Sequence, residues 1–399
     1  MRTAAANPAA PPTAPPGAPD PHPPAGGIGP VGEAVGGAAL QSRGLVTPAG
    51  AAALPSGLTA TAWVLVDLDS GNILAAQDAH GRYQPASILK ILTVDTLLPK
   101  LPGNKVVTVS DSAASTEGSR AGLIAGGSYT VDQLFSGLLL VSGNDTATAL
   151  AEAAGGVSQT VSAMNAEALS LGAYDTFVQT PSGLDGWQQL TSAYDMALFL
   201  RAAVNDPRFV AYDQQPSVTL PAQHVNGNGF GAVKLVNQGE PFLTEVPGGY
   251  FSKIGFTDAA QHTYVAATNR GGRRLGVVFL RAQRWPLDQW QQAAPLFDWG
   301  YALASGTPAV GHLDAAVPVT SAKSTAPDRG PAAHHSTAAA AIGTHPTRID
   351  ARRVAYALAA TLGVLVVLSG LSSALADVVH RSRRAGGTGR ARRPARAHR

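Results

Sequence analysis

Apolar positions recur with the periods of strands and helices between about Leu58 and Leu303. Strands are predicted from β-branched and aromatic runs bounded by turn residues, at 62–68, 249–257, 263–268 and 275–280, with another short strand after the turn at 69–72. Helices are predicted from apolar residues three and four apart, at 85–98, 131–140, 145–154, 192–204 and 287–304. Because the strands stand at both ends, we expect one sheet built from the two ends of this region, with a helical subdomain inserted between them.

The composition changes on both sides of this region. Ten prolines fall within the first thirty positions, with few aliphatic residues, so we predict that residues 1–44 are disordered. Residues 45–304 form the predicted folded domain. Alanine, proline, serine and threonine dominate residues 305–353, which is typical of a linker.

Residues 354–376 are twenty-three consecutive positions without a charge. At about 1.5 Å per residue, a helix of this length reaches roughly 34 Å, enough to cross a hydrocarbon core of about 30 Å. The arginine-rich tail at 377–399 follows directly, and the positive-inside rule places it in the cytoplasm. We therefore predict one C-terminal transmembrane helix and an extracytoplasmic folded domain. Such a domain needs an export signal, which the first thirty residues lack, so we expect the natural start to lie upstream of Met1.

Composition and charge remove several function classes. The chain has no cysteine, which excludes disulfide scaffolds, thiol nucleophiles and cysteine-ligated metal centres. Its net charge is +3, but eight arginines lie in the last nineteen residues, so the rest of the chain carries a net charge of −5. The folded region therefore lacks the basic balance that nucleic-acid binding requires.

Ser87 and Lys90 form the first candidate catalytic pair. On a helix, residues three apart share a face, so the serine hydroxyl and the lysine amine come within reach. A serine needs a base to act as a nucleophile, and a lysine can be that base only when it is neutral. Lys90 is the one lysine among six with a serine three positions before it. An ordinary exposed pair is the alternative.

Two further segments carry candidate chemistry. Ser142 has a hydroxyl able to relay a proton to a leaving amine, and the Asn144 amide is able to orient a peptide backbone; helix capping is the alternative for both. Lys253, on a predicted strand, would keep the Lys90 amine neutral and attract a carboxylate; an edge-strand lysine that prevents aggregation is the alternative. Gly255 permits close approach of a substrate, and the Phe256 N–H is a candidate oxyanion donor.

The three segments together match the Ser-x-x-Lys, Ser-x-Asn and Lys-Thr-Gly set of active-serine penicillin-binding enzymes. From about Ala60 to Arg281 the chain resembles the D-alanyl-D-alanine carboxypeptidases of the low-molecular-mass penicillin-binding class (serine peptidase family S11). The similarity extends to residues 66–71, 138–149, 164–166, 182–185 and 192–195.

This resemblance implies an α+β fold of the penicillin-binding and serine β-lactamase type, with a five-stranded antiparallel sheet flanked by helices. It implies that Ser87 attacks the penultimate D-Ala carbonyl of a peptidoglycan stem peptide ending in D-Ala-D-Ala, while Lys90 takes its proton. Ser142 would protonate the leaving D-Ala, and Asn144 and Lys253 would hold the substrate. It further implies inhibition by β-lactams and no cofactor or metal. Together with the predicted span at 354–376, it places the protein at the bacterial cell membrane.

Ile254 departs from the family pattern, which has threonine there. The threonine hydroxyl normally helps to bind the substrate carboxylate, and its loss removes a hydrogen bond worth about 1.5–3 kcal/mol. The departure favours an alternative, a non-catalytic or weakened membrane-anchored module that binds cell-wall peptide. The intact nucleophile and base oppose that alternative, because a binding module needs neither.

Other hydrolases fit less well. A class A β-lactamase would need a deacylating glutamate followed shortly by asparagine, and none of Glu152, Glu167, Glu240 and Glu245 has that context. No Gly-x-Ser-x-Gly elbow or His-Glu-x-x-His pair occurs, which disfavours an α/β-hydrolase and a zinc peptidase.

Overall fold

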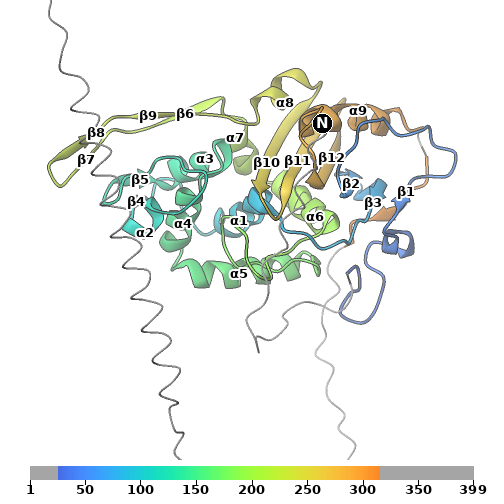
Figure 1. Ribbon diagram of the computed structural model, residues 1–399, viewed down its shortest axis with the longest axis horizontal. Coiled ribbons are helices and arrows are strands. Elements are labelled where there is room, and N and C mark those ends of the chain that lie inside the picture. The colour runs from blue at the N-terminus through green and yellow to red at the C-terminus, as the bar shows by residue number, and fades with distance from the viewer. Residues whose placement is uncertain (1–25, 305, 315–399) are drawn as a thin grey trace, which may run out of the picture. The chain divides into compact units, whose positions relative to one another are not determined.

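The computed structural model describes residues 26–304 and 306–314. At its centre is one antiparallel sheet (Figure 1) whose long strands run in the order β3, β2, β12, β11, β10. Their bounds are Asn72–Gln77 for β3, Ala62–Asp67 for β2, Arg273–Ala282 for β12, Gln261–Arg270 for β11 and Gly249–Thr257 for β10. The sheet is therefore built from the two ends of the folded region, as its sequence predicts.

Two short strands extend this sheet beyond the five that the family resemblance implies. Strands β1 (Leu45–Val46) and β13 (Gly311–His312) both pair with β3. A strand of two residues is too short to show an alternating pattern, so the sequence carries no signal for either. The sheet has seven strands in the described part of the chain.

The helices and small hairpins lie mainly between β3 and β10 along the chain. The helices are η1 (Ala38–Gln41), η2 (Ala86–Leu89), α1 (Lys90–Leu97), α2 (Asp111–Ala114), α3 (Val131–Leu140), α4 (Asn144–Ala153), α5 (Val157–Ser170), α6 (Ala193–Ala203), α7 (Pro207–Asp213), α8 (Glu240–Glu245) and α9 (Gln289–Ala302). The short paired strands are β4 (Val106–Thr108) with β5 (Ser128–Thr130), β6 (Ser217–Leu220) with β9 (Val233–Val236), and β7 (Gln223–Val225) with β8 (Asn228–Phe230). The last two pairs form the arm that projects from the domain in Figure 1.

The sheet separates two hydrophobic cores. Side chains of a strand alternate between its faces, so on β2 Trp63 and Leu65 join the core that includes Phe297 of α9. Val64 and Val66 join the larger core on the other face, with residues of α1, α3, α4 and α6. Because both faces of β2 are covered, its residues are buried throughout.

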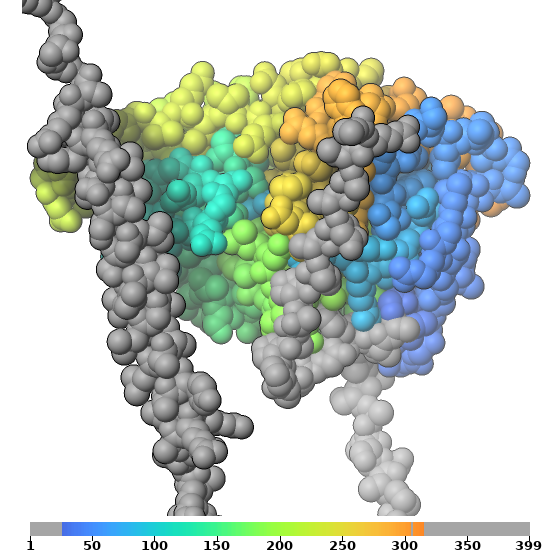
Figure 2. Space-filling model, viewed as in Figure 1, coloured from blue at the N-terminus to red at the C-terminus, as the bar shows by residue number. Residues whose placement is uncertain are grey.

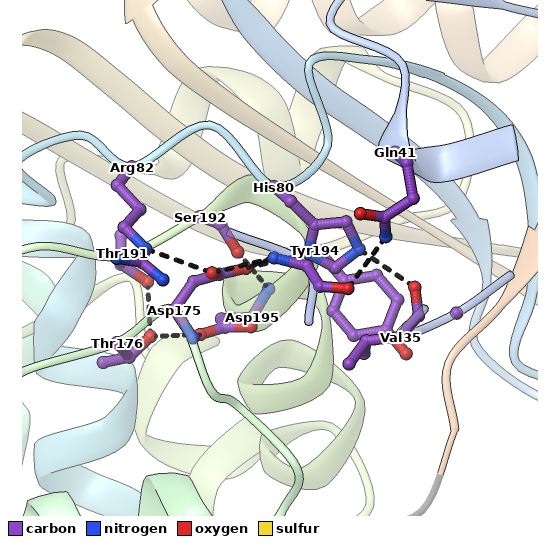
Figure 3. Close-up of polar contacts among 12 residues, drawn as sticks. Val35, Gln41, His80, Arg82, Asp175, Thr176, Thr191, Ser192, Tyr194 and Asp195 are labelled. Atoms are coloured by element: carbon purple, nitrogen blue, oxygen red, sulfur yellow. Dashed lines mark hydrogen bonds and ion pairs between the residues drawn. The ribbon is translucent and has the colours of Figure 1, made fainter. Parts of the chain in front are cut away.

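The prediction of disorder over residues 1–44 is wrong for residues 26–44. Val35 and Leu40 are buried, and the Gly27 N–H donates to Asp175 Oδ1 at 3.1 Å. Figure 3 shows the buried polar cluster that receives this segment: His80 lies between Asp175 Oδ2, at 2.8 Å, and the Val35 carbonyl, at 3.1 Å. Buried polar partners hold the segment in place of a large apolar surface, which composition alone cannot reveal.

The folded domain also extends past the predicted boundary at residue 304. Leu313 is buried, and the His312 N–H donates to the Gly36 carbonyl at 2.9 Å. The two flanks also meet each other, since the Gly36 N–H donates to Asp314 Oδ2 at 2.9 Å, and the N-terminal flank appears in blue in Figure 2. Within the predicted domain, Trp299 Nε1 of α9 donates to the Ala52 carbonyl at 2.9 Å. Both flanks of the predicted domain therefore pack onto it.

Within residues 26–304 and 306–314, no helix is long and apolar enough to cross a membrane. The predicted span at 354–376, the tail at 377–399 and most of the predicted linker lie outside the described residues.

Candidate active site

Ser87 sits in a tight turn rather than in a regular α-helix. The sequence predicts a helix from Pro85 to Leu98, but residues 86–89 form the 3-10 turn η2 and α1 begins only at Lys90. Ala86 has a φ of 49°, in the left-handed region that favours glycine. Such backbone strain persists only where surrounding structure imposes it. The turn thereby presents the Ser87 side chain to the cleft.

Neighbouring segments hold this turn in place. Thr263 Oγ1 of β11 donates to the Pro85 carbonyl at 2.8 Å. Gly183 packs so closely that a Cβ there would collide with the Ala86 carbonyl oxygen. A Cβ at Gly255 of β10 would lie 2.8 Å from the Ser87 backbone nitrogen. Glycine at 255 is therefore needed to bring the edge strand against the nucleophile.

The Lys90 amine lies in a completely buried network. Its Nζ is 2.8 Å from Ser87 Oγ, 2.7 Å from Asn144 Oδ1 and 2.6 Å from the Ser182 carbonyl. The amide and carbonyl oxygens can only accept hydrogen bonds, so a neutral amine gives them its two hydrogens. Its lone pair then faces the Ser87 hydroxyl, which is the arrangement that a general base requires.

Electrostatics favour that neutral form. Burial is the largest cause that places the Lys90 pKa well below the usual lysine value, and the nearby Lys253 charge lowers it further. The Asp145 charge acts in the opposite direction. The loss of solvation on burial therefore has the largest effect on the Lys90 pKa, and it favours the neutral amine that a general base must be.

Ser142 and Lys253 form a second contact across the cleft. Lys253 Nζ donates to Ser142 Oγ at 2.9 Å and to the Ile254 carbonyl at 3.0 Å. Lys253 is 2% exposed, so it is not an edge-strand lysine facing solvent. Burial lowers its pKa to about 8, against the raising effect of Asp213.

The loop of the second motif does not use its polar side chains to cap α4. The N-cap residue of α4 is Gly143, and no side chain caps the helix there. Asn144 Nδ2 donates to the Glu117 carbonyl at 2.7 Å, which fixes its Oδ1 toward Lys90. Ser142, at a φ of 59°, is turned toward Lys253. The capping alternative is therefore wrong for both residues.

A cleft of 580 Å³ contains the nucleophile and the edge of β10. Its lining includes five residues of the three motifs and one neighbour, Ser119. The motif residues are Ser87, Ser142, Ile254, Gly255 and Phe256. Phe256 is 57% exposed, and its ring lies 4.7 Å from that of His262. The structure thus brings together all seven residues that the sequence singles out.

Ile254 faces this cleft, and neither of two threonines near it, Thr257 and Thr263, has a hydroxyl free to replace the threonine that the family pattern has there. Thr257 Oγ1 donates to Asp185 Oδ1 at 2.6 Å and accepts from the Ala260 N–H at 3.0 Å. Thr263 Oγ1 is bound to the Pro85 carbonyl. Both hydroxyls are already engaged in holding loops, so the departure at Ile254 is not compensated by either.

Sequence reasoning missed two backbone groups of the site. The Ser182 and Glu117 carbonyls orient Lys90 and Asn144, respectively. A carbonyl has no side-chain signature, so only the similarity of residues 182–185 to the family pointed to this segment.

Comparisons with known proteins agree with this geometry. The sequence profile of the peptidase S11 family, D-alanyl-D-alanine carboxypeptidase, matches residues 49–284. The chain belongs to this family. It is 41% identical over 262 residues to the D-alanyl-D-alanine carboxypeptidase DacB2 of Mycobacterium tuberculosis. The aligned region covers 65% of this chain and 87% of that protein. The similarity to the family is confirmed, and the chain is a serine peptidase of this class.

Other S11 relatives are longer than the matched region. DacD of Escherichia coli is 33% identical over 260 residues, but the match covers only 64% of its length and 62% of this chain. A crystal structure of the D-alanyl-D-alanine carboxypeptidase of M. tuberculosis has a TM-score of 0.62 and 40% identity, and covers 67% of this chain and 99% of that one. The Streptomyces K15 DD-transpeptidase has a TM-score of 0.59 at 24% identity, over 63% of this chain and all of that one. These structures confirm the penicillin-binding α+β fold.

Proposed function

We propose that this protein is a serine D-alanyl-D-alanine carboxypeptidase in which Ser87 is the nucleophile and Lys90 the general base. One observation carries the assignment of roles: the buried Lys90 Nζ lies 2.8 Å from Ser87 Oγ, and its other contacts are to acceptors only. The substrate is a peptidoglycan stem peptide that ends in D-Ala-D-Ala.

In the acylation step, Ser87 Oγ attacks the carbonyl carbon of the penultimate D-Ala and its proton passes to Lys90 Nζ. The amide C–N bond then breaks, and the proton held by Lys90 passes through the Ser142 hydroxyl to the departing amine of the terminal D-Ala, which leaves Lys90 neutral again. Ser142 suits this relay because its hydroxyl already contacts the Lys253 ammonium at 2.9 Å. The product is an ester between Ser87 and the shortened peptide.

In the deacylation step, water attacks the ester carbonyl and gives a proton to Lys90. The ester bond breaks, Lys90 returns this proton to Ser87 Oγ, and the shortened peptide leaves with a free carboxylate. Penicillin acylates Ser87 in the same way, but its leaving amine stays attached to the acyl group after the β-lactam ring opens. The acyl-enzyme adduct is therefore stable.

Substrate binding is assigned to the edge of the sheet and the second motif. β10 is the last strand in the sheet order, so an extended peptide is able to add to its free edge. Gly255 allows the close approach, the Phe256 N–H is the proposed oxyanion donor, and the Asn144 amide and Lys253 ammonium hold the peptide and its carboxylate.

We also propose, on the sequence alone, that residues 354–376 anchor the enzyme in the bacterial cell membrane as a single-pass helix with the catalytic domain outside. The uncharged length and the following arginines support this proposal. Protease protection of the C-terminal tail in intact cells tests it, because a tail digested from outside would contradict it.

The rival function is a binding module that does not cleave. The test is acylation of the full chain by a fluorescent penicillin, beside Ser87→Ala, together with release of D-Ala from a peptide ending in D-Ala-D-Ala. We expect labelling and D-Ala release by the wild type and neither by Ser87→Ala. Equal labelling of both proteins, or labelling without any D-Ala release, would favour the binding module.

A further inference from the structure

Gln189 is a completely buried glutamine just after Ser182 in the chain, and no step of the proposed mechanism uses it. Its Oε1 accepts hydrogen bonds from the Gln179 N–H at 2.9 Å and the Thr180 N–H at 2.7 Å. Its Nε2 donates to the Leu184 carbonyl and, at 3.1 Å, to Thr180 Oγ1. A glutamine amide has two donor hydrogens and two acceptor lone pairs, so all four are used on one short stretch of chain.

The hydrogen bonds of Gln189 bracket the backbone of residues 181–183. Two of its partners precede this stretch and one follows it, so a single side chain ties the two ends together. On the side of α1, Thr93 Oγ1 donates to the Pro181 carbonyl at 2.6 Å. The backbone of Ser182 is therefore held both by Gln189 and by the helix that carries Lys90.

The direction of the Ser182 carbonyl decides what the Lys90 amine does. Lys90 Nζ lies 2.6 Å from this carbonyl and 2.7 Å from Asn144 Oδ1. When these two acceptors take both hydrogens of the neutral amine, its lone pair is left for Ser87. If the carbonyl turned away, the released N–H would be free to point at Ser87 Oγ. The amine would then be a donor to the nucleophile instead of its base.

We propose that Gln189 is a positioning residue for catalysis, which holds the Ser182 carbonyl against Lys90 and so keeps the lone pair of that amine directed at Ser87. The proposal rests on the function proposed above and deepens it by naming the side chain that sets the direction of the base. The side-chain hydrogen bonds of Gln189 go to residues 179–184, and Gln189 does not line the cleft. It acts only through the backbone that it holds.

The test is Gln189→Met in the full chain, because methionine has about the length of glutamine and makes none of its hydrogen bonds. Two quantities are measured with a fluorescent penicillin: the second-order rate constant of acylation and the fraction of the protein that is finally labelled. A misplacement of about 1 Å can cost about a hundredfold in rate, so we expect the rate constant to fall about ten- to a hundredfold. The labelled fraction should match that of the wild type, because every folded molecule still has Ser87.

A purely structural role would have a different signature. Fewer molecules would fold, so the labelled fraction would fall while the rate constant of the folded molecules stayed at the wild-type value. That result would overturn the proposal.

Gln223→Met is the matched control. Gln223 is 9% exposed, and its amide also binds backbone groups, the Ser128 N–H at 2.9 Å and the Ser128 carbonyl at 3.0 Å. It lies on β7 and does not line the cleft. We expect this variant to lose stability and to keep the wild-type rate constant. An equal fall of the rate constant in Gln189→Met and Gln223→Met would overturn the proposal.

Thr180→Val keeps the proposal testable if Gln189→Met fails to fold. Valine has the shape of threonine and lacks the hydroxyl, which lies 3.1 Å from Gln189 Nε2 and 3.4 Å from the Leu184 carbonyl. The other hydrogen bonds of Gln189 remain, so we expect a smaller loss, about threefold, in the same rate constant. A rate constant equal to that of the wild type would overturn the proposal.

The Lys90 amine gives a readout that does not depend on activity. An acceptor held against an amine stabilises its ammonium form, so loosening the Ser182 carbonyl should lower the Lys90 pKa further. The charges of Lys253 and Asp145 also act on this pKa, and the variants change neither residue.

Lysine labelled with carbon-13 at Cε reports each amine by nuclear magnetic resonance, and the chain has only six lysines. We expect the protonation step of Lys90 at lower pH in Gln189→Met than in the wild type, and at the wild-type pH in Gln223→Met. Coincident steps in all three proteins would overturn the proposal. A wild type that penicillin never acylates would instead contradict the proposed function, while this comparison would still decide whether Gln189 acts on Lys90.

Discussion

Replacing Ile254 by threonine should increase carboxypeptidase activity. The residue faces the cleft and is 38% exposed. Threonine keeps the branched Cβ, so strand β10 and its pairing of residue 254 with Tyr264 should be undisturbed. The new hydroxyl is placed to donate to the terminal carboxylate of the substrate beside the Lys253 ammonium. The engaged hydroxyls of Thr257 and Thr263 offer no equivalent in the wild type.

The expected gain follows from one hydrogen bond to a charged group, about 1.5–3 kcal/mol, or about ten- to a hundredfold in kcat/KM. Water reaches this partly exposed position and competes for the carboxylate, so we expect the lower end, about tenfold.

The assay compares kcat/KM for a peptide ending in D-Ala-D-Ala with that for the same peptide carrying a C-terminal amide. Ile254→Val is the matched control, because valine has the shape of threonine without the hydroxyl. We expect a gain only for Ile254→Thr and only with the free carboxylate. An equal gain with Ile254→Val, or with the amide, would refute the reasoning.

Three further changes test the site and the fold. Lys90→Arg should lower the rate of acylation by penicillin at least about a hundredfold, because a guanidinium keeps its proton and cannot act as the base; a rate within a few-fold of wild type would contradict the role of Lys90. Asn144→Leu should lower the free energy of unfolding in urea by about 2–5 kcal/mol, because the Lys90 amine and the Glu117 carbonyl each lose their hydrogen bond to the Asn144 amide. Unchanged stability would contradict this. Leu40→Ala should cost about 2–5 kcal/mol of unfolding free energy, because Leu40 is 1% exposed, and no loss would contradict the docking of residues 26–41. The acylation rate of Ser87 should be unchanged, because Leu40 packs against Gly36 and Gly311 and does not line the cleft.

The strands and long helices could be predicted because their apolar periods are local. The strand at 249–257 and the helix at 131–140 have the predicted bounds in the structure. The helix predicted from Pro85 begins instead with a strained turn, since packing against Gly183 and β11 overrides the local preference around Ala86. Tertiary contacts of this kind leave no periodic signal.

The candidate site was predictable where side chains carry the chemistry. Ser87 meets Lys90, and Ser142 meets Lys253, as their types and order imply. The Ser182 carbonyl and the burial of Gln189 depend on how distant segments pack, so the sequence offered no direct signal for either. Residues 26–44 were misjudged for the same reason: buried polar partners such as Asp175 and His80 hold them, together with only two core side chains, Val35 and Leu40.

The central claim is that the Lys90 amine is neutral when it meets Ser87, and its protonation state can be measured directly. In the full chain labelled with carbon-13 at lysine Cε, the Lys90 resonance should be that of a neutral amine at the pH where acylation is fastest, with its protonation step far below the usual lysine range. A Lys90 signal that remains that of an ammonium up to the ordinary lysine pKa of about 10.4 would contradict the account.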